Sequence, residues 1–330
     1  MSQKRILFMT GFPGFIGRKL IEKAMEAEPG LEAVCLVEPR FEFRAREEAR
    51  RMGADGGGGQ RITVVAGDIT RLGLGLDPET ARDLAERVTD VFHLAAIYDL
   101  AVPEPAARRV NVWGTRHVIE FCRRVKGLRR FVYYSTCYVC GLRTGVFHED
   151  ELDLGQGFKN HYESTKHDAE FLVRRASRDL PTIIIRPAIV VGDSRTGETQ
   201  KFDGPYFGMI LIDKLKRLGV PLPYLGKSRA EVNFVPIDYI VDGTIALWRK
   251  EPAVSGTFAL ADPHPLLAKE LYAEIVRGLG ARGPMGSVPP MLMELPLRLR
   301  PVRGFLEVPA EVLTYFNHPV RFDCSRALEA

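Results

Sequence analysis

The chain has 330 residues, of which 45% are hydrophobic and 27% charged, as in an ordinary globular protein of one large domain or two joined lobes. Its formal net charge of +4 is small and spread along the chain, which argues against nucleic-acid binding. No apolar run approaches the about 20 residues of a membrane span, so we expect none.

Apolar strands alternate with helices over the first half of the chain. Strands are predicted over residues 5–10, 33–37, 62–65, 91–95, 131–134 and 182–185. Helices are predicted from about Phe15 onward and over residues 43–52, 78–87 and 112–125. Strands rich in Val, Ile and Leu that alternate with helices predict an α/β fold, a doubly wound parallel Rossmann sheet with helices on both faces.

The pattern becomes less regular after residue 187, where a polar loop is predicted over 192–208 and helices over 214–223 and 266–279. We therefore expect a Rossmann domain and a smaller, mixed C-terminal substrate lobe at the sheet edge where such folds bind ligands. The Rossmann domain is assigned residues 1–186 with a return segment near 232–248, and the lobe residues 187–231 and 249–330. The apolar residues of the lobe form either its own core or an acyl site: Phe207, Met209, Ile210, Met291 and Leu292.

A glycine-rich turn follows the first strand and opens the first helix. It comprises Gly11, Phe12, Pro13, Gly14, Phe15, Ile16 and Gly17. Glycines permit a tight turn and close approach of the backbone to a pyrophosphate, whose negative charge the helix N-terminus favours. The spacing differs from the commoner Gly-x-Gly-x-x-Gly, but its position after the first strand predicts a dinucleotide site.

Charged residues after the second strand give conflicting indications about the cofactor. Glu38 lies about 20 residues beyond the last glycine, where a carboxylate can hold a ribose 2′-hydroxyl and favours NAD. Arg40 and Arg44 follow, and an arginine there can hold the 2′-phosphate of NADP. A surface role for all three is an alternative, so the sequence predicts NAD(H) or NADP(H) and leaves the preference open.

Two further strand ends offer cofactor contacts. Asp68 and Ile69 follow the third strand, where a carboxylate can accept a hydrogen bond from the adenine amino group. Leu94, Ala95 and Ala96 follow His93 at the end of the fourth strand, and small residues there let the backbone pass close to a cofactor. No second ligand is suitably spaced from His93, so no metal site is predicted.

Tyr162 and Lys166 lie four residues apart in a predicted helix, so their side chains share one face. A nearby ammonium favours the phenolate, and such a phenol can exchange a proton with a carbonyl oxygen. Taken alone, the pair is more typical of an ordinary exposed helix face.

Taken together and in this order, the motifs resemble those of the extended short-chain dehydrogenases/reductases over nearly the whole chain. The shared segments are the glycine turn and residues 68–69, 93–96, 111–115, 135–136 and 162–166. Residues 67–76, 162–170, 186–194 and 233–239 are similar to one branch, the thioester reductases and fatty acyl-CoA reductases. The resemblance implies a nicotinamide-dependent enzyme. Independently of it, the five cysteines and the lack of an export signal favour reduced thiols and a location in the cytoplasm.

The resemblance also implies catalytic roles. Tyr162 matches the general acid/base, and Lys166 matches the residue that holds the nicotinamide ribose and lowers the pKa of the phenol. Thr136 matches the hydroxyl that binds the substrate carbonyl, in preference to Ser135, because the family's hydroxyl lies five residues before a glycine, here Gly141.

Three further positions match the family. Asn111 matches a residue near the catalytic lysine or its water relay. The backbone that meets the nicotinamide carboxamide corresponds to Pro187, Ala188 and Ile189.

The branch implies a small-molecule substrate: an acyl thioester, as a CoA ester or on a separate acyl carrier, or an aldehyde or ketone on an acyl chain. Alternatives are a nucleotide-sugar epimerase or dehydratase, a hydroxysteroid-type dehydrogenase, and a non-catalytic NADP-sensing regulator. Glu38 favours the epimerase, which keeps a tightly bound NAD, whereas residues 74–76 and 186–194 favour the reductase. The reductase branch often has arginine at the position of Glu38, which argues against a preference for NADPH. By analogy with other proteins of this fold, a homodimer that forms through two helices is expected as one alternative. The chain ends soon after residues 322–327, earlier than in its relatives, which suggests a trimmed or short C-terminus.

Overall fold

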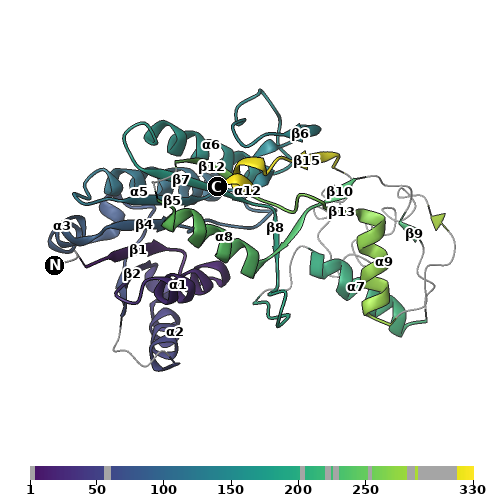
Figure 1. Cartoon of the computed structure of the whole chain (residues 1–330), viewed down its shortest axis with the longest axis horizontal. Helices are drawn as coiled ribbons and strands as arrows, with labels where there is room; N and C mark the ends of the chain where they lie inside the picture. Colours follow the sequence, from purple (N-terminus) through teal and green to yellow (C-terminus); the bar gives the residue numbers. More distant parts are fainter. Residues whose placement is uncertain are drawn as a thin grey trace.

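The computed structural model describes residues 4–55, 61–200, 205–219, 224–225, 230–251, 255–280, 287–288 and 318–330. A seven-stranded sheet forms its centre, in the order β12-β7-β5-β4-β1-β2-β3 (Figure 1). Its strands are β1 (Ile6–Thr10), β2 (Glu32–Val37), β3 (Ile62–Ala66), β4 (Asp90–His93), β5 (Arg130–Tyr134), β7 (Thr182–Pro187) and β12 (Gly256–Leu260). All neighbouring pairs are parallel, so the predicted doubly wound sheet is confirmed.

The sheet is buried on both faces because helices cover each one. Alternate residues of β1 enter separate cores: Leu7 and Met9 on one face, Ile6 and Phe8 on the other. The first face is covered by α1 (Phe15–Ala27), α2 (Glu42–Asp55) and α8 (Ile237–Arg249). The second is covered by α3 (Pro78–Arg87), α5 (Thr115–Cys122) and α6 (His161–Ala176).

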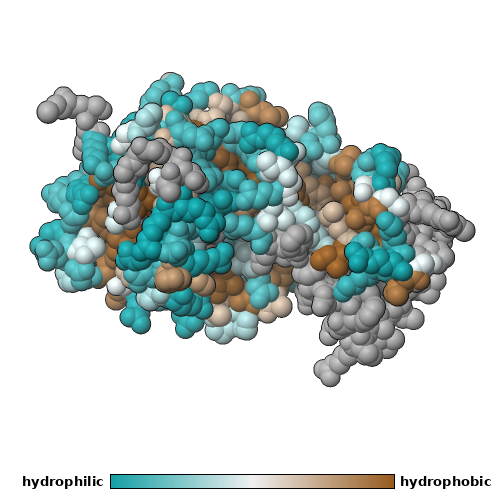
Figure 2. Space-filling view, turned by 90° about the horizontal axis from the view of Figure 1, so that it is seen from below, coloured by the Kyte–Doolittle hydropathy of each residue, from teal (hydrophilic) through white to brown (hydrophobic). Residues whose placement is uncertain are grey.

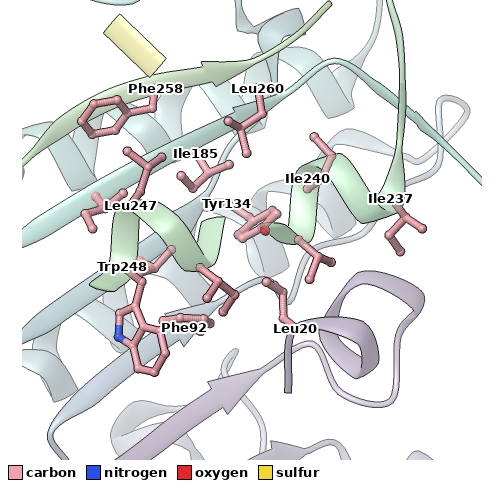
Figure 3. Close-up of a cluster of buried hydrophobic side chains, with 14 of the residues drawn as sticks. Leu20, Phe92, Tyr134, Ile185, Ile237, Ile240, Leu247, Trp248, Phe258 and Leu260 are labelled. Carbon is pink, nitrogen blue, oxygen red and sulfur yellow. The ribbon is translucent and has the colours of Figure 1, made fainter. Parts of the chain in front are cut away.

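One aromatic pair fixes α8 on the first face of the sheet. Trp248 packs edge-on against Phe92 of β4 with ring centroids 5.5 Å apart (Figure 3). Its indole Nε1 donates to the buried carboxylate of Asp90 over 2.8 Å, so the polar edge of the ring is also satisfied. The aromatic pair and the apolar residues of α8 therefore hold this helix against the sheet.

Several short helices and strands lie in the segments that connect the strands of the central sheet. They are η1 (Pro39–Phe41), η2 (Leu72–Gly75), α4 (Glu104–Ala107), the π-helix η3 (Arg108–Gly114), η4 (Cys137–Cys140), β6 (Gly145–Phe147), β8 (Ile189–Val191) and β11 (Phe234–Pro236). The helix predicted over 112–125 thus begins earlier, through α4 and η3, and ends at Cys122. The fourth strand ends at His93, two residues before its predicted end.

Two helices outside the sheet, α7 (Pro205–Arg217) and α9 (Ala268–Gly278), lie together at one end of the molecule (Figure 1). Ile212 of α7 packs against Tyr272 and Val276 of α9. The short strands are β9 (Tyr224–Leu225), β10 (Glu231–Val232), β13 (Leu266–Leu267) and β14 (Ser287–Val288). Hydrophilic residues predominate on the larger part of the face shown in Figure 2, and hydrophobic patches lie both there and near this end.

The structure differs from the sequence prediction at two places in this region. The predicted helix over 214–223 is shifted to Pro205–Arg217, so the loop predicted over 192–208 ends earlier. β12 lies in the segment 249–330 assigned to the lobe, yet it pairs with β7 as the edge strand of the sheet. After it in the chain, β15 (Val320–Phe322) pairs with β6 and α12 (Ser325–Glu329) packs on β12. The division of the chain into two lobes remains a proposal.

The described helices include none that is both long and apolar enough for a membrane span. Of the residues suggested for an acyl site, Met209 and Ile210 are partly buried in α7. Met291 and Leu292 lie outside the described residues, as does the side chain of Phe207.

Candidate active site

The glycine turn is built so tightly that side chains would not fit in it. Gly11 has φ +99°, and a Cβ there would lie 2.8 Å from that of Leu94. A Cβ on Gly14 or Gly17 would lie 2.7 or 2.8 Å from the carbonyl oxygen of Gly11. These contacts are with backbone atoms or with a Cβ fixed to the backbone, which cannot move aside cheaply, so each position requires glycine.

A cavity of about 410 Å³ begins at this turn and continues over the carboxyl ends of the central strands. Most of the predicted site residues line it: Gly11, Gly14, Phe15, Ile16, Gly17, Leu94, Ala95, Ala96, Thr136, Tyr162, Lys166, Pro187, Ala188 and Ile189. The prediction had not included Tyr98, Leu100, Tyr138, Val232 and Phe234, which also line it. Phe234 lies within the segment 233–239 that resembles the branch, whereas the other four lie outside the quoted motifs, in loops and short elements at the carboxyl ends of the strands.

The turn and the cavity fit a dinucleotide. The glycines leave space for a pyrophosphate against the backbone, and α1 begins at Phe15 with no acidic residue in its first turn, so nothing there opposes a negative charge. The cavity then leads from this helix end to Tyr162 and Lys166.

We expect Gly14→Ala to weaken dinucleotide binding by roughly 10-fold or more, because its Cβ would push the turn away from a pyrophosphate. Isothermal titration with NADH and NADPH measures this loss. Gly30→Ala is the matched control, since no atom lies within 4 Å of a Cβ built at that position. Equal affinity in both variants would contradict a pyrophosphate site at the turn.

The remaining predicted cofactor residues lie beside the cavity lining. Phe12 is buried in the core, and Pro13 follows it in the turn. Asp68 accepts a hydrogen bond from the Thr70 amide over 2.8 Å, and Ile69 is buried behind it. Their contacts with a cofactor stay predictions.

The charged residues after β2 form an exposed group. The guanidinium of Arg40 lies 2.8 Å from the carboxylate of Glu38 and packs over the ring of Phe41 at 4.7 Å. Arg44 is exposed on the first turn of α2. The acid and the arginine that favour different cofactors are therefore paired with each other.

Tyr162 and Lys166 are both buried, at 9% and 4% exposure, on the inner side of α6. Asn160 sets the start of this helix, because its side chain accepts a hydrogen bond from the Glu163 amide over 2.9 Å. The phenol of Tyr162 forms a hydrogen bond with Thr136, and the ring of Tyr98 packs edge-on against it at 5.1 Å. Burial raises the pKa of Tyr162, the reverse of the direction predicted from the nearby ammonium, so the phenol is neutral at pH 7.

Ser135 and Thr136 have separate partners. Ser135 Oγ donates to the buried carboxylate of Glu170 over 2.5 Å. The Thr136 hydroxyl accepts from the Tyr138 amide over 3.2 Å and also bonds the phenol of Tyr162. Both residues line the cavity, so the choice of Thr136 as the hydroxyl that faces a substrate stays a prediction.

Asn111 is 1% exposed in the π-helix η3, a type of distortion frequent at functional sites. Its Oδ1 accepts from the Ile97 amide over 2.9 Å, and its Nδ2 donates to Thr165 Oγ1 over 3.0 Å. Asn111 thus ties the loop after β4 to the residue beside Lys166, while a direct role toward the lysine stays a prediction.

Lys166 Nζ donates to the carbonyl oxygen of Tyr134 over 2.5 Å and to the phenol oxygen of Tyr133 over 2.9 Å. Burial lowers the pKa of Lys166 to about 7, although the carboxylate of Glu170 opposes this shift. The sequence prediction missed Tyr133. Its signal was the alternation along β5, which places it on the face opposite Tyr134.

Comparison with known proteins now places the chain. The model of an NAD-binding family described as male sterility protein matches residues 9–244. The chain belongs to this family. A fatty acyl-CoA reductase of Drosophila melanogaster is 25% identical to it over 277 residues, which cover 73% of this chain and 53% of that protein. The L-2-aminoadipate reductase large subunit of Penicillium chrysogenum is 27% identical over 300 residues, covering 82% and 21%.

Solved structures share the fold of this chain. The terminal R domain from the myxalamid PKS-NRPS biosynthetic pathway has a TM-score of 0.82 and 26% identity, covering 100% of this chain and 85% of that one. UDP-glucuronic acid 4-epimerase from Bacillus cereus in complex with NAD has a TM-score of 0.66 and 19% identity, covering 98% and 91%, a likeness of fold alone.

These findings confirm the predicted membership in the thioester reductase and fatty acyl-CoA reductase branch of the extended short-chain dehydrogenases/reductases. At the level of the family they also confirm the enzyme class and a nicotinamide cofactor. The chain spans about half the length of the fatty acyl-CoA reductases that it matches and 21% of the aminoadipate reductase.

Proposed function

We propose that this chain is a nicotinamide-dependent reductase that acts on an acyl thioester, or on an aldehyde or ketone of an acyl chain. One observation carries the proposal: the Thr136–Tyr162 hydrogen bond and Lys166 lie in the cavity that begins at the glycine turn. A proton donor and a dinucleotide site thus open into one space, as reduction of a carbonyl requires.

A nicotinamide cofactor held along Gly11, Gly14 and Gly17 would supply the hydride. Thr136 and Tyr162 donate hydrogen bonds to the substrate oxygen, which gains negative charge as the reaction proceeds. Tyr162 then transfers its phenol proton to this oxygen. The raised pKa of Tyr162 keeps that proton in place at neutral pH, so the resting protein is suited to the reducing direction.

Lys166 has two tasks in this scheme. Its ammonium favours the phenolate that Tyr162 becomes after proton transfer. It also supplies a donor for the nicotinamide ribose. Because its pKa lies near 7, the charged form that both tasks need is lost as the pH rises above this value.

The acyl substrate is proposed from the printed names of the relatives, a fatty acyl-CoA reductase, an aminoadipate reductase and a synthase R domain. The cavity lining agrees, since Leu94, Leu100, Val190, Val232 and Phe234 present apolar groups to it. We propose delivery as a CoA ester or on a separate carrier protein.

A nucleotide-sugar epimerase is the second candidate, favoured by Glu38 and by the similarity of fold to an NAD-bound epimerase. Following absorbance at the NADH and NADPH band separates the two. We expect oxidation of the reduced cofactor with acyl-CoA, acyl-carrier or acyl-chain aldehyde substrates. Turnover with UDP-sugars alone would contradict the acyl proposal, and cofactor binding without any turnover would indicate a regulator.

For the cofactor we propose a preference for NAD(H), because the carboxylate of Glu38 repels a 2′-phosphate and neutralises Arg40 at 2.8 Å. Glu38→Gln removes this charge and frees the arginine. We expect kcat/KM with NADPH to rise by roughly 5-fold, since the loss of one nearby charge at an exposed site changes the binding free energy by about 1 kcal/mol.

Steady-state kinetics with both cofactors check this expectation. Glu47→Gln is the matched control, because Glu47 is an exposed acid of α2 paired with Arg50 in the same way. A wild-type protein that prefers NADPH, or a Glu38→Gln variant with an unchanged NADPH/NADH ratio, would contradict the proposed preference.

A further inference from the structure

A buried chain of polar side chains runs beneath the cavity floor, from the glycine turn to Lys166. It passes through Thr10 of β1, His93 of β4, Thr115 of α5 and Tyr133 of β5. All four are at most 1% exposed, so no bulk water satisfies their polar groups. The proposed function uses none of them.

The hydroxyl and imidazole hydrogen atoms of these four side chains can be placed by counting donors and acceptors. Thr115 Oγ1 lies 2.6 Å from the carbonyl oxygen of Asn111, which can only accept, so the Thr115 hydroxyl donates there. Its oxygen is then left to accept from His93 Nε2 at 3.0 Å and from the Tyr133 phenol.

The hydrogen bonds at the Thr10 end of this row of side chains agree with this assignment. If His93 Nε2 carries the proton, Nδ1 must accept, and Thr10 Oγ1 lies 2.7 Å from it as a donor. The Thr10 oxygen in turn accepts from the Ala95 amide at 3.2 Å. Burial lowers the pKa of His93 to about 3, in keeping with a neutral ring of one fixed tautomer.

The consequence for Tyr133 is a fixed direction of its hydroxyl. The phenol proton points to Thr115, so the lone pairs of the oxygen face Lys166, whose Nζ lies 2.9 Å away. A buried ammonium needs such acceptors, because it has lost its water. Tyr134 supplies a second one through its carbonyl oxygen.

We propose that Tyr133 is a positioning residue, whose phenol oxygen is oriented by Thr115 to accept from Lys166 and so holds the ammonium charged on the inner side of α6. This inference rests on the role proposed for Lys166 under the proposed function. The titratable groups that face Lys166 are Tyr162 and Glu170 of α6, His93 of β4 and Tyr133 itself. Of these, Glu170 is the acid, His93 stays neutral, and Tyr133 makes the direct contact.

Tyr133→Phe removes the oxygen and keeps the ring. A hydrogen bond stabilises a charged group by a free energy that corresponds to about one pKa unit or more. Because Tyr133→Phe removes such a bond from the ammonium, we expect the pKa of Lys166 to fall by about one unit. The charged form would then be lost at lower pH. The alkaline limb of kcat should move down by the same amount, with KM for the substrate little changed.

The direct measurement uses protein labelled with 13C at the lysine ε-carbon and titrated by NMR without cofactor, with Lys166→Met to assign the signal. Thr244→Val is the matched control: it removes a buried hydroxyl bonded to the neighbouring Tyr134 phenol at 2.6 Å, on the opposite face of β5. We expect the titration of Lys166 to be unchanged in this control. An unchanged titration in Tyr133→Phe, or an equal shift in Thr244→Val, would overturn the inference.

A second pair of variants covers the case in which Tyr133→Phe does not fold. Thr115→Val removes the acceptor that orients the phenol, whereas Thr115→Ser keeps it, so only the first should lower the pKa of Lys166. Equal titrations in the two would also overturn the inference. Failure of the proposed function looks different: a Tyr162→Phe variant would then stay active, whatever Lys166 does.

Discussion

Tyr162→Phe is expected to lower kcat for carbonyl reduction by roughly 100-fold or more, the usual contribution of a general acid. The change removes the proton that the substrate oxygen receives and one of the two hydrogen bonds that stabilise its charge. The ring stays in place against Tyr98, so the shape of the cavity is kept. Binding of the cofactor at the glycine turn should change little, which isothermal titration can show.

Tyr272→Phe is the control for the loss of a buried phenol. This tyrosine lies on α9, packed against α7 and away from the cavity lining, so its variant should keep the wild-type kcat. Single-turnover kinetics on both variants report the chemical step directly. Wild-type turnover in Tyr162→Phe would falsify the assignment of this residue as the proton donor.

The sequence predicted the fold well because its signals are local and repeated. Each central strand reads as a run of apolar residues, and the parallel sheet buries it on both faces, as in β1 with Leu7 and Phe8 in opposite cores. β12 escaped the prediction, because the chain was assigned to the lobe from residue 249 onward, whereas Gly256 to Leu260 follow α8 and add the edge strand of the sheet. Such a return is a long-range event that no window of sequence records.

For the candidate site too, the sequence predicted the residues of short motifs and missed those that only the fold brings together. The glycine turn and the Tyr162–Lys166 pair are short motifs whose spacing determines their geometry, and they meet in one cavity. Tyr133 and Thr115 act through contacts between β5, α5 and α6, which the sheet order creates. The direction of the pKa shift of Tyr162 was also wrong, because sequence spacing shows a neighbouring charge and does not show how deeply a phenol is buried.

Glu170→Gln is expected to destabilise the fold by about 3 kcal/mol or more, the usual result of removing one partner of a buried ion pair. Glu170 is fully buried and accepts four hydrogen bonds. Its Oε1 lies 2.9 Å from Arg174 Nε and 2.7 Å from an Arg186 nitrogen, while Oε2 accepts from Arg186 Nε and from Ser135. An amide would turn N–H groups toward these donors and leave the 1%-exposed Arg186 without its counter-charge.

Chemical denaturation at several pH values tests this expectation, with Asp83→Asn as the control. Asp83 forms an i,i+4 pair with Arg87 at 2.6 Å, but both side chains are 51% exposed, so its loss should cost at most about 1 kcal/mol. The two arginines lower the pKa of Glu170 below its ordinary value against the effect of burial. Its stabilisation is therefore present above the unfolded pKa of about 4.3 and is lost as the pH falls through the lowered folded value. Glu170→Gln should remove this part of the acid dependence, and a variant as stable as Asp83→Asn at pH 7 would show that the buried pair does not hold α6 to the sheet.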